Sequence, residues 1–424
     1  MASTQAPPPI AIIGGGPGGL TLARLLEVQG IDYVLYERDA NVRASRGWRG
    51  SLLLHPEGGQ RIMSVAGLVD QFEKHARYEE RHVRITRPSG ICELRLGEDD
   101  DPITKEPPKT PEIDHGTLRQ ILVDSIPRHK ILWGHALKSV ERDADGKPVL
   151  NFTNGRSVTG FKLVVGADGV RSKVRPLLTP TKLVYADKVW IEARITPKHR
   201  WWDYWNRILG PGTIMTLGTW RSIQISRQVD GTYQVYFQLM IPEDYYHHKF
   251  VNKDGTAQDP LDCNNPERMR RYLLDFNLFG DWARDWHELI LGLVDFRAWP
   301  LYGLPRLYVQ DWKSVSGVTA LGDAAHASYP SERSVDIAMR DAMELVDKLH
   351  EYGTVADGKI DEAVRAYEAV MLPRGAEHIK ICRRWCNEMV QEWNPDAFLH
   401  YVKDIFFQAG QPIEEKFWLN TQIE

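Results

Sequence analysis

A run of glycines near the start of the chain, GGGPGG at positions 14–19, constrains the fold more than any other segment. The run follows a short apolar stretch, Pro9–Gly14, and precedes a stretch with apolar residues at helical spacing that ends at Gly30. A second apolar stretch, Tyr33–Tyr36, comes next. Strand, glycine turn, helix and strand within about thirty residues predict a βαβ unit with two parallel strands.

The glycine spacing gives the turn a specific chemistry. Gly14, Gly16 and Gly19 satisfy the pattern G-x-G-x-x-G, in which the first allows a tight turn, the second lets backbone approach a pyrophosphate, and the third lets helix and strand pack closely. Glu37 ends the second strand, where a carboxylate accepts a hydrogen bond from a ribose hydroxyl, and Arg38 follows it. The segment therefore predicts a dinucleotide site that includes these five residues.

Two later segments repeat the theme of a strand that ends in a glycine and an aspartate. LVVGADGVRSKVR, residues 163–175, carries Asp168 at its strand end, and ALGDAA, residues 320–325, carries Asp323. An aspartate at such a position can accept a hydrogen bond from a ribityl hydroxyl, and the basic turn that follows Asp168 suits phosphate contacts.

The middle of the chain follows a different pattern. Short, partly alternating runs within residues 84–96 and 188–240, such as TYQVYFQLMI, predict an antiparallel sheet in a second lobe. The acidic, proline-bearing segment 97–111 is expected to be an exposed connection. Pro373 is expected to precede a long C-terminal helix from about Gly375 to Gln391.

Composition excludes several functional classes. Lysine and arginine total 53 against 57 acidic residues, so no nucleic-acid partner is expected. No apolar run reaches the ~20 residues of a transmembrane helix, and the opening MASTQAPPP lacks the pattern of a secretory signal. The four scattered cysteines predict neither a disulfide framework nor a metal site and suit the cytoplasm.

The three glycine-containing segments, in this order, resemble the class A, single-component flavin-dependent monooxygenases of the para-hydroxybenzoate hydroxylase-like family. The closest likeness is to the tetracycline-destructase-like and fungal secondary-metabolism branch. DHGTLRQIL contains Arg119, which matches the family's arginine near the flavin ribityl and phosphates. RGWRGSLLLHPEGGQRIM, with Arg49 and His55, matches the loop that lines the flavin edge, and YEAVMLPR, residues 367–374, matches the C-terminal segment.

The resemblance implies an α/β fold in which a Rossmann-like FAD-binding domain is interleaved with a mainly antiparallel β-sheet substrate domain, followed by a C-terminal helical region. It also implies FAD as cofactor, NADPH or NADH as reductant, and hydroxylation or epoxidation of a bulky aromatic or polycyclic natural product. The expected boundaries are 1–80, 109–182 and 301–374 for the FAD-binding domain, 81–108 and 183–300 for the substrate domain, and 375–424 for the helical region.

The chain departs from the family at one place. Members usually follow GDAAH with a proline and then G-x-G-x-N at a helix start, whose amides face the flavin ring. Here Pro330 remains, but Glu332, Ser334 and Asp336 replace both glycines and the asparagine. A Cβ can obstruct close approach of backbone, and a carboxylate repels an anionic reduced ring.

Three interpretations therefore stay open: an oxygenase, a redox-neutral cyclase or isomerase on a scaffold that has lost flavin chemistry, and a non-catalytic binding module. For the redox-neutral case the candidate catalytic side chains are Glu332, Asp336 and Arg49. A small-molecule substrate is expected, bound by a monomer or homodimer. The candidate substrate contacts, chosen as aromatic or polar residues of the second lobe and the flavin-edge loop, are Trp205, Trp220, Arg221, Gln238 and His55.

Overall fold

The computed structural model describes residues 8–44, 50–78, 83–96, 110–210, 212–244, 250–251, 257–258, 261–352 and 359–390. The loop around Arg49 and the connection at 97–109 lie outside the described residues. Contacts divide the chain into two compact units, each assembled from separate stretches of sequence. Unit 1 comprises residues 1–78, 109–184 and 302–383, and unit 2 comprises residues 79–108, 185–301 and 384–424.

Unit 1 is built on a five-stranded parallel sheet in the order β19-β11-β1-β2-β7. Its strands are short and almost wholly apolar, as expected for strands covered on both faces. They are β1 (Ile10–Ile13), β2 (Tyr33–Tyr36), β7 (Ile131–Leu132), β11 (Leu163–Gly166) and β19 (Val318–Ala320). The βαβ unit predicted from the glycine run is confirmed, because β1 and β2 pair in parallel on either side of α1 (Pro17–Val28).

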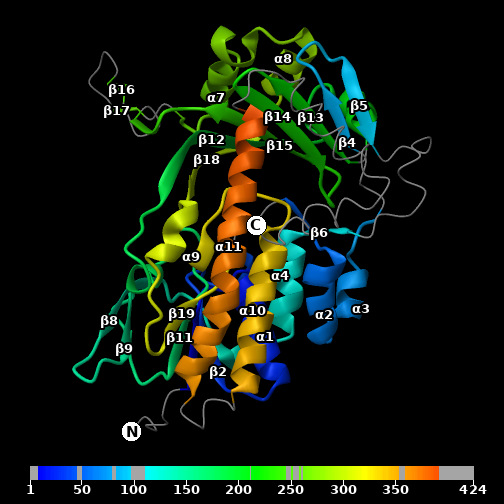
Figure 1. The fold of residues 1–424 in the computed structure, drawn as a ribbon. Helices are drawn as coiled ribbons and strands as arrows, with labels where there is room; N and C mark the ends of the chain where they lie inside the picture. Colours follow the sequence, from blue (N-terminus) through cyan, green and yellow to red (C-terminus); the bar gives the residue numbers. More distant parts are fainter. Residues whose placement is uncertain are drawn as a thin grey trace, which may run out of the picture. The chain divides into compact units, whose positions relative to one another are not determined.

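The helices of unit 1 pack on this sheet and on one another. Helix α1 contacts both α4 (His115–Asp124) and α10 (Ser334–Glu351) (Figure 1). The other helices of the unit are α2 (Arg61–Val65), α3 (Val69–Glu73), α9 (Asp323–His326), α11 (Ile360–Val390), the π-helix η2 (Pro56–Gln60), and the 3₁₀ helices η1 (Val42–Ala44), η4 (Arg128–Lys130), η5 (Arg175–Leu177) and η7 (Arg306–Gln310). Two further small sheets join β8 (Leu137–Arg142), β9 (Pro148–Phe152) and β10 (Ser157–Val158), and β3 (Ser51–Leu53) with β6 (Glu112–Asp114).

The C-terminal helix differs from expectation. Helix α11 begins at Ile360 and runs through Pro373, whereas the sequence placed its start after the proline. Ile360, Val364 and Met371 all lie in the core of unit 1. Burial of this apolar stripe outweighs the one backbone hydrogen bond that a proline removes, so the predicted helix start after Pro373 was wrong.

Unit 2 contains a seven-stranded, mainly antiparallel sheet in the order β18-β12-β15-β14-β13-β4-β5. The pairing of β13 with β4 is parallel. The strands are β4 (Val83–Thr86), β5 (Cys92–Leu96), β12 (Val184–Ile195), β13 (Thr213–Gly218), β14 (Arg221–Arg227), β15 (Tyr233–Met240) and β18 (Val294–Gly303), and a separate hairpin pairs β16 (Phe250–Val251) with β17 (Ala257–Gln258). One face of the sheet packs against α5 (Trp202–Leu209), α7 (Pro266–Leu273), the π-helix η6 (Phe276–Gly280) and α8 (Arg284–Leu291) in a single apolar core.

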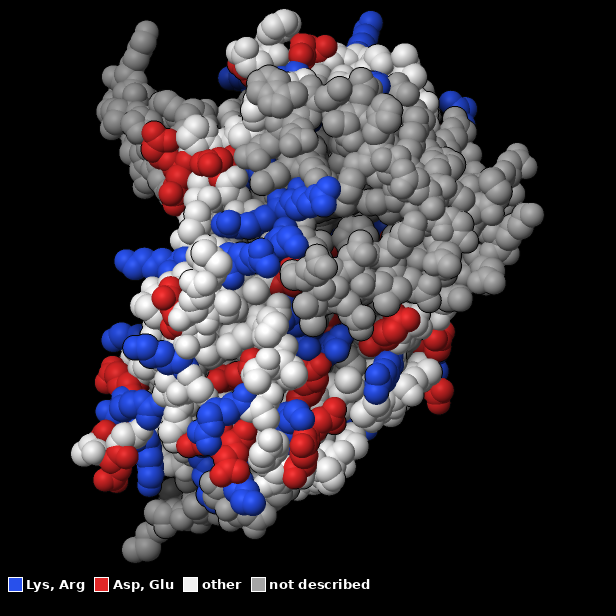
Figure 2. Space-filling model, viewed as in Figure 1, with Lys and Arg blue, Asp and Glu red and all other residues white. Residues whose placement is uncertain are grey.

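The charge of the described surface and the apolar character of the described helices both bear on what the protein can bind. In Figure 2, basic and acidic side chains are interspersed over the described surface in the lower part of the view. Within the described part of the chain, no helix combines the length and the apolar character needed to cross a membrane.

Candidate functional site

The glycine turn of unit 1 joins β1 to α1 with very little room to spare at two positions. Gly14 has a φ of +110°, and a Cβ there would meet the backbone of Ala167. A Cβ at Gly19 would meet the carbonyl oxygen of Gly14. Gly16 is different, because a Cβ there would meet no atom within 4 Å, and Gly16 precedes α1 without a side-chain cap. The turn therefore presents open space and uncapped amides at a helix N-terminus, the arrangement that binds a pyrophosphate.

Arg119 forms a buried ion-pair cluster with Glu37 and Asp39 beside this turn. The Glu37 carboxylate accepts hydrogen bonds from the amides of Gly15 (2.5 Å) and Asp39 (2.9 Å). The Arg119 guanidinium lies 3.8 Å from Glu37 and 3.1 Å from Asp39, and its Nε donates to the Gly15 carbonyl at 2.9 Å. Arg119 is only 2 % exposed. Two residues predicted from separate segments thus meet at one point.

The sequence predicted Arg38 as a member of this site and did not predict Asp39, and the structure gives them different roles. The Arg38 side chain is 73 % exposed, and among the described residues it pairs with Asp39 alone, at 4.0 Å. Asp39 was not predicted, although it directly binds Arg119. Its position two residues after Glu37, just beyond the apolar strand Tyr33–Tyr36, is the signal that sequence reasoning passed over.

Asp168 follows β11 and holds the turn that leads to η5. Its Oδ2 accepts from the Lys173 amide at 2.7 Å, and Ser172 Oγ accepts from the amides of Val174 and Arg175. Burial raises the pKa of the Asp168 carboxyl against the opposing hydrogen bonds. Its second oxygen, Oδ1, is buried and has no hydrogen-bond partner among the described residues. A buried carboxylate oxygen without a partner is costly in the free protein and marks a place for a ligand hydroxyl.

Asp323 begins α9, directly after Gly322, and the second and third motifs meet there. Arg175 donates to the carbonyl oxygens of Asp323 and Ala324, both at 3.2 Å. Burial raises the pKa of the Asp323 carboxyl, while the nearby His326 and Arg175 oppose the rise. No described residue donates a hydrogen bond to this carboxylate in the structure. The aspartates of both predicted ribityl motifs therefore retain free accepting capacity.

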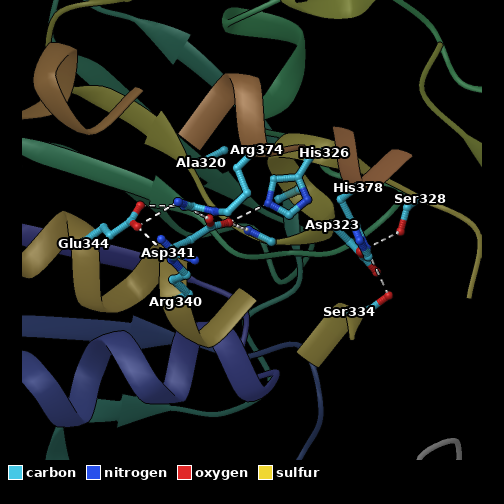
Figure 3. Close-up of polar contacts among 12 residues, drawn as sticks. Ala320, Asp323, His326, Ser328, Ser334, Arg340, Asp341, Glu344, Arg374 and His378 are labelled. Carbon is cyan, nitrogen blue, oxygen red and sulfur yellow. Dashed lines mark hydrogen bonds and ion pairs between the residues drawn. The ribbon is translucent and has the colours of Figure 1, made fainter. Parts of the chain in front are cut away.

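An ion-pair network behind Asp323 fixes the turn (Figure 3). Asp341, which is 0 % exposed, accepts from the Gly322 amide (2.8 Å), from His326 Nε2 (2.6 Å) and from Arg374 (2.7 Å). Arg374 also bonds Glu344. Burial works to lower the pKa of His326, but the charge and hydrogen bond of Asp341 outweigh it and raise the pKa. His326 is thus held as a structural support of the turn.

A second histidine connects α11 to the start of α10. His378 Nε2 lies 3.2 Å from Ser328 Oγ and 3.4 Å from Ser334 Oγ, as Figure 3 shows. Burial, helped by the charge of His326, lowers the pKa of His378 to about 3. His378 is therefore neutral at physiological pH and was not predicted, because only the folded chain brings it to Ser334.

The start of α10 contains the residues that replace the family glycines and asparagine. Asp336 is buried and accepts from His55 Nδ1 (2.5 Å), from the His55 amide (3.2 Å) and from the Gly59 amide (2.6 Å). Glu332 is exposed. Among the described non-glycine residues, positive φ occurs only at Asp187, Trp220 and Asp295, so no residue at the start of α10 needs a glycine's conformation.

The other candidate substrate residues lie in unit 2. Trp205 is 3 % exposed and packs in the unit's core, and Arg221 is engaged by the Asn277 carbonyl (2.7 Å) and by Asp281 (2.5 Å). Trp220 stands at the hairpin turn between β13 and β14 with a φ of +65°. Gln238, on β15, is 1 % exposed and neither end of its amide has a partner among the described residues.

The residues of unit 1 fit FAD at the nucleotide and ribityl positions. The open space at Gly16, the uncapped start of α1, the unpartnered Asp168 Oδ1 and the free Asp323 carboxylate are what the pyrophosphate and the ribityl hydroxyls require. Helix α10 also begins without a side-chain cap, although the amide of its first residue, Ser334, already donates to the Ser331 carbonyl oxygen at 3.3 Å.

Residues 8–231 match the FAD binding domain family, and the chain belongs to that family. The predicted α/β fold class, the FAD cofactor and the assignment to FAD-dependent oxidoreductases are confirmed.

Individual relatives are distant but cover most of the chain. The chain is 27 % identical to "Monooxygenase penA" of Penicillium thymicola, over 88 % of this chain and 93 % of that protein. It is 27 % identical to a 3-amino-4-hydroxybenzoate 2-monooxygenase of Streptomyces cremeus, over 89 % and 87 %. Among solved structures, FqzB gives a TM-score of 0.73 at 18 % identity, covering 95 % of this chain and 89 % of that one. HpxO of Klebsiella pneumoniae with FAD and uric acid gives 0.69 at 21 %, covering 93 % and 92 %. At these identities the structures show a shared fold.

Proposed function

We propose that this protein is an FAD-dependent monooxygenase that hydroxylates or epoxidises a bulky aromatic or polycyclic compound of secondary metabolism, with NADPH or NADH as reductant and O₂ as co-substrate. In this proposal unit 1 is the FAD-binding domain and unit 2 is the substrate domain. Bound FAD supplies the redox chemistry, and the chain's own residues bind and orient the reactants and exclude water.

The observation that carries the proposal is the set of free accepting groups around the glycine turn. Asp168 Oδ1 and the Asp323 carboxylate lack partners among the described residues, beside a helix start that no side chain caps. A chain that had lost its nucleotide would gain stability by filling or pairing these positions, because unpaired buried polar groups are costly. Relatives named as monooxygenases along most of the chain's length give further support.

An absorption experiment tests this function. The purified protein, mixed with FAD and freed of excess cofactor, is expected to show the flavin band and to lose it on addition of NADPH under nitrogen, with recovery when air is admitted. A matched Asp168→Ala variant is expected to retain less FAD because the ribityl acceptor is gone. Protein that stays colourless with excess FAD, or keeps its colour with both NADPH and NADH, would overturn the proposal.

The second candidate is a redox-neutral cyclase or isomerase, favoured by the acidic residues that stand where the family has glycines and asparagine. The structure limits the available acids. Asp336 already accepts three hydrogen bonds, so the exposed Glu332 is the remaining carboxyl at this helix start. Turnover of substrate by FAD-free protein would establish this candidate instead.

We further propose that the protein acts on its substrate in the cytoplasm as a monomer or homodimer. The four cysteines, all within the described residues, form no disulfide, which suits a reducing compartment. Light scattering of the purified protein tests the oligomeric state.

A further inference from the structure

A row of polar side chains crosses the sheet of unit 2 on the face opposite its apolar core. Gln238 of β15 pairs in register with Trp190 of β12 on one side and with Ser222 of β14 on the other. Residues directly opposite each other on neighbouring strands point to the same face. We call Trp190, Gln238 and Ser222 the central row.

The alternation of the strands separates this row from the core. Val189, Phe237 and Ile223, each one residue along its strand from a member of the row, are fully buried in the apolar core with α7 and α8. Successive side chains of a strand point to opposite faces. The central row therefore belongs to the other face of the same sheet.

Gln238 and Ser222 are buried and Trp190 is half-buried, yet the hydrogen-bonding groups of all three are unused. Gln238 and Ser222 are each 1 % exposed. Gln238 Oε1 and Nε2, Ser222 Oγ and Trp190 Nε1 are all buried with no hydrogen-bond partner in the described structure. One such atom is unremarkable in a native protein, but four at adjacent register positions are not, because each carries the desolvation cost of an unpaired polar group.

The row carries no charge of its own, and two charged side chains on the same face, Glu192 and Arg194, are already engaged. Glu192, two residues along β12 from Trp190, accepts a hydrogen bond from Trp299 Nε1 at 3.0 Å. Arg194, two residues further, pairs with Asp230 at 2.5 Å. The row itself therefore offers only neutral donors and acceptors. Lys188, two residues before Trp190 on the same face of β12, is fully buried, and burial lowers the pKa of its ammonium group.

The geometry points to a neutral, planar ligand with a cis-amide edge, such as an aromatic lactam, as the substrate class of the proposed oxygenase. This inference rests on the proposed function. A glutamine amide presents one acceptor and one donor side by side, and a cis-amide presents the complementary donor and acceptor. A trans-amide has these groups on opposite sides, and a carboxylate has no donor for Gln238 Oε1. Ser222 and the Trp190 ring provide a further polar contact and an aromatic surface.

Calorimetric binding to FAD-loaded protein tests the inference with a matched pair of probes, isoquinolin-1(2H)-one and its N-methyl derivative. The lactam is expected to bind at least tenfold more tightly than the N-methyl compound, since a site built around hydrogen bonds rejects a ligand that lacks one. Gln238→Leu is expected to remove this preference, and Ser222→Ala to weaken both probes. Gln224→Leu, on the same face of β14 and outside the row, is the control and is expected to keep the preference.

A thermal unfolding measurement separates recognition from a structural role. Gln238→Leu is expected to melt no lower than the wild type, because its amide has no partner to lose in the free protein. A clear loss of stability, equal binding of the two probes, or an unchanged preference in Gln238→Leu would overturn the inference, as would ordered water that satisfies the row while the lactam fails to bind. Failure of flavin reduction with intact lactam preference would count against the proposed function alone.

Discussion

Arg119→Met is the sharpest test of the buried ion-pair cluster beside the glycine turn. Arg119 is 2 % exposed and is the guanidinium that faces both Glu37 and Asp39. Methionine keeps most of the apolar length of the side chain but leaves two carboxylates without their cation. The Gly15 carbonyl also loses its bond from Arg119 Nε.

The expected loss can be estimated from the burial of each partner. Removing one partner of a buried ion pair costs about 3–5 kcal/mol. The Glu37 side chain is 7 % exposed and Asp39 is 18 % exposed, so water relieves part of the charge left on Asp39. We therefore expect about 3 kcal/mol of unfolding free energy to be lost, which for a domain of roughly 150–250 residues lowers the melting temperature by about 6–12 °C.

Differential scanning calorimetry of the FAD-free protein provides the measurement. Arg38→Met is the matched control, because its guanidinium is 73 % exposed and we expect a change within about 0.5 kcal/mol. If the two variants melt within a degree of each other, the ion-pair cluster does not stabilise unit 1 and the reasoning is wrong. FAD affinity, measured on the same samples, is expected to fall in Arg119→Met.

Three other predictions concern the same unit. Gly19→Ala is expected to lower the melting temperature of FAD-free protein through its clash with backbone, whereas Gly16→Ala is expected to leave that temperature unchanged and to weaken FAD binding; loss of stability in both would contradict the open space at Gly16. Because the pKa of His326 is raised, its contribution to unfolding free energy is complete below its unfolded pKa of about 6.5 and is lost as pH rises through the folded value. Urea unfolding across pH should show this loss in the wild type and not in Asp341→Asn. Asp336→Ala is expected to lower the free energy of unfolding by about 2–3 kcal/mol, measured by urea unfolding, because it leaves buried donors unpaired. If the curve of this variant coincides with that of the wild type, the hydrogen bonds of Asp336 contribute no net stability.

Local patterns predicted the nucleotide half of unit 1 well. The strands Ile10–Ile13 and Tyr33–Tyr36 lie within the predicted apolar runs, because glycines and short length leave a buried strand few alternatives. The G-x-G-x-x-G spacing also predicted the roles of Gly14 and Gly19, because a Cβ at either position would clash with backbone.

Long-range partners could not be predicted in the same way. His55 and Asp336 are 281 residues apart in sequence, and no local pattern links a residue before a π-helix to one at the start of α10. The start of α11 was misplaced for a related reason: local propensity breaks a helix at Pro373, and only the folded core shows that the stripe on either side is buried.

The His55 contact also changes how the departure from the family pattern should be weighed. Glycines at the start of α10 would matter if the backbone there needed positive φ, and among the described residues of this segment none has it. Asp336 accepts three hydrogen bonds, which fix its carboxylate toward His55 and Gly59 without neutralising its charge. Solvent weakens the field of the exposed Glu332, so the electrostatic objection to an anionic reduced flavin rests mainly on the buried Asp336. The substituted helix start consequently argues less against flavin chemistry in the structure than it does in the sequence.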